Sequence, residues 1–89
     1  MKITIEFLAQ LRVAVGEART TLECAEGTRV VDLVESLAGT HGEDFRGLTL
    51  DGDGVRRTLL VAIDGRQAGG EDPLADGDVL VLGTPIAGG

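Results

Sequence analysis

The sequence predicts an α+β domain in which one main helix packs across a mixed sheet of four to five strands. Short β-prone segments lie in both halves of the chain, and one apolar stripe at helical spacing lies between them. Turn signals separate these elements. A chain of 89 residues supports one domain. We expect the domain to span residues 1–82 and a flexible tail that ends in Gly-Gly to span residues 83–89.

The first two strands are expected to form a hairpin. In residues 2–8, Ile3, Ile5 and Phe7 alternate with polar side chains, a pattern typical of a half-buried strand. Residues 19–24 contain two threonines and alternate again. Because the connection between them is long and holds a turn signal at its end, we expect a hairpin with a long loop.

The main helix is expected to begin after an Ala-Glu-Gly break. Thr28 is positioned to cap it with its hydroxyl. Gly39 or Gly42 can end it, because glycine tolerates the left-handed conformation that follows a helix. The expected buried stripe consists of Val30, Leu33, Val34, Leu37 and Ala38.

Residues 41–57 are polar and rich in glycine, so we expect an irregular connection. Phe45, Leu48 and Leu50 are expected to attach it to the core. Its Asp-Gly-Asp-Gly segment resembles part of a calcium loop, but it lacks the closing glutamate and the ligand spacing. A plain turn is therefore expected.

The remaining strands are expected in the last third of the chain. Residues 58–63 predict a strand that ends in a tight Asp-Gly turn. A short edge segment is expected within residues 67–74. Residues 79–82 are wholly apolar, which is typical of a central strand.

The charge of the chain limits its partners. Its formal net charge is -7, and an acidic surface repels nucleic-acid phosphates and anionic lipids. We therefore expect neither nucleic acid nor membrane as a partner. No segment approaches the roughly 20 apolar residues of a membrane span, and the N-terminus lacks the apolar stretch of a signal peptide. The expected compartment is the cytoplasm.

No residue pattern in the sequence indicates a catalytic or metal site. Cys24 lies near Glu23 and Glu26, whose charges would raise the pKa of its thiol, which favours a structural cysteine. His41 has no triad-like partner and is expected to be an exposed loop residue. Arg56 and its neighbour Arg57 could meet an acidic partner, but we expect them to be solvated. We therefore expect no bound cofactor, no metal and no enzyme activity of the chain's own.

The last seven residues carry the chemistry that the sequence indicates. Their glycines and proline disfavour regular structure, and fully extended they reach about 23–25 Å. Without side chains, Gly88 and Gly89 can enter a narrow slot. An activating partner could join the Gly89 carboxylate to AMP, and a sulfur nucleophile could then displace AMP and leave a thiocarboxylate. Gly89 is the expected chemical site, and Gly88 gives access to it.

Two segments resemble the MoaD/ThiS family of ubiquitin-like sulfur carriers. They are residues 7–16, with Phe-Leu-Ala-Gln-Leu-Arg, and residues 73–89, with Pro-Leu-Ala-Asp-Gly-Asp and the final Pro-Ile-Ala-Gly-Gly. The resemblance implies a β-grasp fold with the first and last long strands parallel. It implies three partners: an adenylating enzyme that uses ATP, a sulfurtransferase or persulfide donor, and a large catalytic subunit or acceptor enzyme.

The branch of this family that the sequence resembles is MoaD, the small subunit of molybdopterin synthase. It implies sulfur donation in molybdenum cofactor biosynthesis or in a related pathway to cysteine, thiamine or a secondary metabolite. Gly83 stands where that family commonly has a bulky residue, which predicts a weaker apolar docking surface. By family position the partner-binding residues are Leu8, Pro85, Ile86 and Ala87, although ordinary sheet packing accounts for Leu8 equally well.

Two other functions fit the same sequence. A ubiquitin-like modifier would use the activated carboxylate of Gly89 to form bonds with lysines on other proteins. A β-grasp interaction module would make no use of the tail. Isopeptide-linked adducts would indicate the first, and full function without Gly88 and Gly89 would indicate the second.

Overall fold

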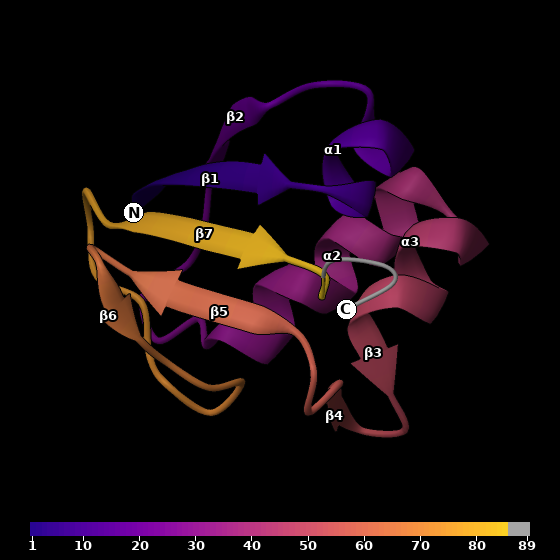
Figure 1. Cartoon of the computed structure of the whole chain (residues 1–89). Coiled ribbons are helices and arrows are strands. Elements are labelled where there is room, and N and C mark those ends of the chain that lie inside the picture. The colour runs from indigo at the N-terminus through magenta and orange to yellow at the C-terminus, as the bar shows by residue number, and fades with distance from the viewer. Residues whose placement is uncertain (86–89) are drawn as a thin grey trace.

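The sheet is built around two parallel strands from opposite ends of the chain. In the computed structural model, which describes residues 1–85, β1 (Lys2–Leu8) pairs in parallel with β7 (Val79–Gly83). β2 (Arg19–Glu23) pairs antiparallel with the other edge of β1, so the expected hairpin is confirmed. The parallel pairing that the family resemblance implied is also confirmed (Figure 1).

Two further strands complete a five-stranded mixed sheet with the order β2-β1-β7-β5-β6. β5 (Leu60–Ile63) pairs antiparallel with β7, and β6 (Arg66–Gln67) forms the short edge. Asp64 and Gly65 connect β5 to β6 with φ angles of 50° and 83°. Positive φ at both central residues is the geometry of a type I′ hairpin turn. The expected tight turn is therefore confirmed.

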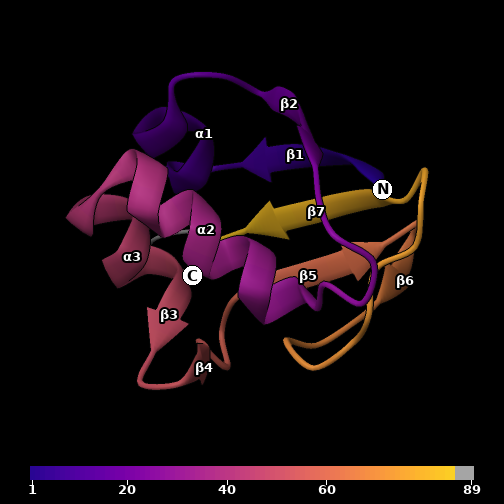
Figure 2. The same ribbon diagram turned by 180° about the vertical axis from the view of Figure 1, so that it is seen from behind.

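One long helix, α2 (Val30–His41), crosses one face of this sheet (Figure 2). Its expected stripe is buried, and Gly42 ends it with a φ of 94°. The buried residues of α2 are Val30, Val31, Leu33, Val34, Leu37 and Ala38.

The expected cap of α2 is wrong. The Thr28 hydroxyl donates to the Ala25 carbonyl oxygen at 2.6 Å, and the N-cap position is Arg29. The backbone N–H groups of Val30 and Val31 donate instead to carbonyl oxygens of Asp72 and Gly70, at 3.0 and 2.9 Å. The first turn of a helix needs external acceptors, and here a loop distant in sequence supplies them.

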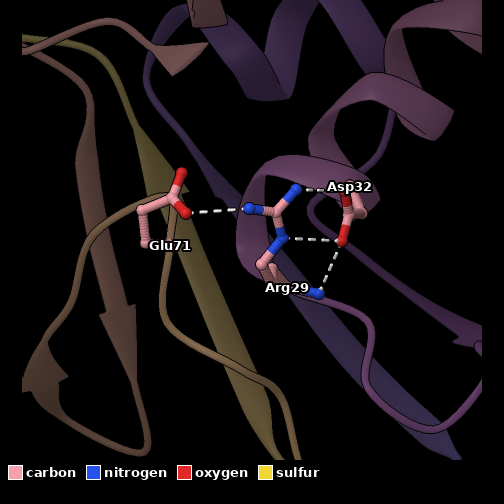
Figure 3. Close-up of polar contacts among 3 residues, drawn as sticks. All are labelled: Arg29, Asp32 and Glu71. Atoms are coloured by element: carbon pink, nitrogen blue, oxygen red, sulfur yellow. Dashed lines mark hydrogen bonds and ion pairs between the residues drawn. The ribbon is translucent and has the colours of Figure 1, made fainter. Parts of the chain in front are cut away.

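An ion-pair cluster holds the same junction together (Figure 3). The Arg29 guanidinium donates to both carboxylate oxygens of Asp32, at 3.1 and 3.2 Å, and to Oε1 of Glu71 at 2.8 Å. The backbone N–H of Arg29 also donates to Asp32 at 3.0 Å. These bonds raise the pKa of Arg29 and lower the pKa of Asp32.

Two connections contain more structure than expected. Residues 10–15 form the helix α1 (Gln10–Val15), and the connection expected to be irregular contains the helix α3 (Glu43–Thr49). A two-stranded ribbon, β3 (Leu50–Asp51) and β4 (Gly54–Val55), follows α3 and contains the expected Asp-Gly turn.

Burial explains α3. Phe45 and Thr49 are fully buried and lie four residues apart, so one face of the helix packs into the core. The Phe45 ring meets the Phe7 ring edge-to-face, with ring centroids 6.3 Å apart and an interplanar angle of 83°. Apolar packing at this spacing outweighs the low helix propensity of the glycine in the middle of the segment.

Candidate functional site

Three residues lie side by side at the point where the chain leaves the sheet. Leu8 at the end of β1 and Leu60 at the start of β5 both lie opposite Gly83, the last residue of β7. We call Leu8, Gly83 and Leu60 the tail-root patch. The two leucine residues are 43% and 48% exposed, and with Val13 they are the exposed large apolar residues of the part of the chain that the structure describes.

Strand alternation places the patch on the face of the sheet opposite α2. Phe7 and Val61 are buried in the core, so their neighbours Leu8 and Leu60 point to the other face of the sheet. An exposed apolar pair on a sheet face is typical of a protein-binding surface. Sequence reasoning found Leu8 and missed Leu60. Alternation with the buried Leu59 and Val61 places Leu60 on the outer face, but only the pairing of β5 with β7 sets it beside Gly83.

Gly83 lets the two leucine side chains close over β7. A Cβ at Gly83 would lie 3.2 Å from the Cβ of Leu8 and 3.5 Å from Cδ2 of Leu60. The expectation of a weaker apolar docking surface at Gly83 stays a prediction. The neighbouring strands supply the apolar atoms that the glycine lacks.

The last strand extends one residue beyond the expected range of 79–82, because Gly83 pairs within β7. Thr84 is 9% exposed, and its Oγ1 is buried without a hydrogen-bond partner among the described residues. Pro85 is exposed, so the chain reaches the surface directly beside the patch. The expected site residues Ile86, Ala87, Gly88 and Gly89 lie outside the described residues.

The alternative candidate residues do not assemble a catalytic site. Cys24 is partly buried, and burial, with a smaller contribution from Glu23, raises the pKa of its thiol. Within residues 1–85, no group of three His, Cys, Asp or Glu side chains could hold a metal ion. No helix in this part of the chain is long and apolar enough to cross a membrane.

One of the two expectations about His41 and Arg56 is wrong. His41 is the last residue of α2 rather than a loop residue, and its ring lies 5.7 Å from the ring of Phe45. Arg56 is exposed, as expected of a solvated side chain, and its Nε also donates to the Gly47 carbonyl oxygen of α3 at 2.7 Å. Both residues therefore have structural contacts.

A comparison with models of protein families shows the family to which the chain belongs. The model of the ThiS family matches residues 5–89, which includes the whole of the tail. This chain belongs to the ThiS family. The relationship expected from its two motifs, to ubiquitin-like carriers of the MoaD/ThiS type, is confirmed. A search of curated proteins found no match.

Two solved structures of similar fold are consistent with this family assignment. The HVO 2177 protein of Haloferax volcanii is 26% identical, with a TM-score of 0.87 over 100% of this chain and 87% of its own. A molybdopterin converting factor subunit 1 of Pyrococcus furiosus, described as putative, is 27% identical, with a TM-score of 0.77 over 97% and 99% of the two chains.

A third structure shows the fold alone. SAMP1 of Haloferax volcanii is 22% identical, with a TM-score of 0.85 over 100% of both chains. These matches and the strand order confirm the expected α+β, ubiquitin-like β-grasp fold of this ThiS-family chain.

Proposed function

We propose that this chain is a sulfur carrier that acts through the carboxylate of Gly89. The observation that carries the proposal is the position of the tail root. The last strand of the sheet ends between two exposed leucine residues and delivers the chain to the surface at Pro85. The ThiS-family match, which extends through Gly89, supports the same assignment.

The proposed chemistry takes place on partner enzymes. The Gly89 carboxylate attacks the α-phosphorus of ATP, so an acyl-adenylate forms and pyrophosphate leaves. Sulfide then attacks the acyl carbon and displaces AMP, which leaves a thiocarboxylate. If the sulfur donor is a persulfide, an acyl disulfide forms first, and a second thiol releases the thiocarboxylate by cleaving the S–S bond. The chain itself supplies neither cofactor nor catalytic group.

The tail-root patch is proposed to contact these partners. Because Leu8 and Leu60 are already about half buried, covering the rest of each side chain contributes about 1 kcal/mol, roughly half of the value for a fully exposed leucine. Pro85, Ile86 and Ala87 are proposed to extend that contact toward the partner's active site. Similar structures support an acceptor partner, since they include a BexX/CysO complex of Amycolatopsis orientalis and a complex of molybdopterin-converting factor subunits 1 and 2 of Helicobacter pylori.

The proposed destination of the sulfur is molybdopterin or a related sulfur metabolite, such as cysteine, thiamine or a secondary metabolite. The similarity to the Pyrococcus furiosus protein favours molybdopterin. We propose the cytoplasm as the compartment, because the charging reaction consumes ATP.

Intact-mass spectrometry tests the function. The chain is incubated with ATP, a sulfur donor and the adenylating enzyme of the same organism. The proposal predicts the mass gain of one sulfur replacing one oxygen, and deletion of Gly89 should abolish this gain while the fold is retained. Failure of the wild-type chain to gain sulfur would overturn the proposal, and isopeptide-linked adducts on lysines would favour a protein modifier instead.

A further inference from the structure

A groove between α1 and α3 lies at the same end of the sheet as the tail-root patch. Its volume is about 500 Å³. α1 begins two residues after Leu8 and contacts β7, and Figure 1 shows both helices at the end of the sheet toward which β1 and β7 point. The groove is lined by Gln10, Val13 and Ala14 of α1 and by Glu43, Asp44, Gly47 and Leu48 of α3.

The lining of the groove includes the apolar side chains of Val13, Ala14 and Leu48. Val13 is 82% exposed, and the same helix already anchors itself in the core through Leu11, which is fully buried. The exposure of Val13 therefore serves no core packing. Gly47 leaves open space opposite, because a Cβ there would meet no atom within 4 Å. An apolar side chain of a partner can enter this space and cover Val13 and Leu48.

The rim of the groove is acidic. Glu43 is 92% exposed, and its one ion pair in the described part of the chain is a 4.0 Å contact with Arg46. Asp44 takes part in no ion pair within residues 1–85. One carboxylate without an ion pair in the described part of the chain and one with a single 4.0 Å contact, both beside apolar side chains, favour a cationic partner.

The negative charge beside the groove also disfavours two occupants, a second copy of this chain and the chain's own tail. A second copy of this chain carries a net charge of -7 and would be repelled. The chain's own tail offers a carboxylate, which has the same sign as Glu43 and Asp44. A different protein with a basic surface avoids both repulsions.

We propose that the groove binds a basic segment of the adenylating partner. The segment places an apolar side chain over Val13 and Leu48, and lysine or arginine opposite Glu43 and Asp44. This inference rests on the proposed function. An enzyme that joins a glycine carboxylate to ATP must hold two anionic reactants, so cationic side chains surround its site. A partner that receives the tail at Pro85 meets the groove on the same end of the domain.

Two groove variants and one matched control test this proposal. Glu43→Gln combined with Asp44→Asn removes the charge of the rim, and Gly47→Phe fills the groove. Glu23→Gln combined with Glu26→Gln removes the same charge near the other end of β1, about 20 Å away along the strand. Binding of the adenylating enzyme is measured by calorimetry, and activation is measured by ATP–pyrophosphate exchange.

Each groove variant is expected to raise the Kd, and the KM for the carrier, about tenfold, with kcat unchanged because the tail is intact. The control should stay within about twofold of wild type. The double charge variant should also lose most of the salt dependence of the wild-type KM, because screening acts on the removed charges.

The outcomes separate the groove from the proposed function. Wild-type exchange with an unchanged KM and Kd in the groove variants would overturn the groove proposal alone. A wild-type chain that binds through the groove but supports no exchange would overturn the proposed function alone. A chain that neither binds nor supports exchange would overturn both.

Discussion

Leu8 and Gly83 lie directly opposite each other in the parallel pairing of β1 and β7, and the leucine occupies the space beside the glycine. A Cβ at Gly83 would lie 3.2 Å from the Cβ of Leu8, which is closer than ordinary van der Waals contact. The Cβ of Leu8 is fixed to its backbone and cannot rotate away. The close approach of these strands at the tail root therefore depends on glycine.

Gly83→Val is expected to destabilise the domain by about 1–3 kcal/mol, because the added atoms must displace Leu8 and Leu60. Gly39→Ala is the matched control. A Cβ at Gly39 meets no atom within 4 Å, and alanine in this helix should stabilise the domain by up to about 1 kcal/mol. Urea unfolding measures both free energies. Equal stability of Gly83→Val and wild type would contradict the packing described here.

Replacing both exposed leucine residues with serine, Leu8→Ser and Leu60→Ser, should impair partner binding without unfolding the domain. Each side chain is about half exposed, so its loss removes little core packing. We expect the KM for adenylation to rise at least about tenfold, as for apolar anchors in protein interfaces. Circular dichroism and Tm serve as controls for folding. An unchanged KM in a folded double variant would remove the tail-root patch from the interface.

Asp32→Asn should reduce stability at neutral pH and have less effect in acid. The Arg29 guanidinium and backbone N–H hold the pKa of the Asp32 carboxyl below its value in the unfolded chain. The resulting stabilisation is present above the unfolded pKa of about 3.9 and is lost as the pH falls through the lower folded pKa. Urea unfolding from pH 7 down to pH 3 measures the difference between the two proteins. If the difference in the free energy of unfolding between wild type and Asp32→Asn grows as the pH falls, it contradicts this prediction.

The sequence predicted the elements whose signals are local. Alternation in β1 and the apolar stripe of α2 follow from side-chain periodicity, and the structure buries those residues as expected. The parallel pairing of β1 with β7 was available only through the family resemblance, since periodicity within a strand carries no information about its neighbours.

The incorrect predictions concern features that depend on contacts with residues distant in the sequence. The N-terminus of α2 is satisfied by carbonyl groups of Gly70 and Asp72, some forty residues away, so its local threonine is not needed as a cap. α3 was expected to be irregular because its glycine and charged residues conceal the helical spacing of Phe45 and Thr49. At the candidate site, Leu8 was predicted from family position, whereas Leu60 becomes visible only when β5 is set beside β7.

Fragmentation mass spectrometry of the charged protein tests the central claim most directly, because it locates the transferred sulfur. The account predicts that one sulfur replaces one oxygen on the fragment that contains Gly89, and that Cys24→Ser is charged as well as wild type. Sulfur added to Cys24 without loss of oxygen, with no change at Gly89, would show a persulfide relay and would contradict the account.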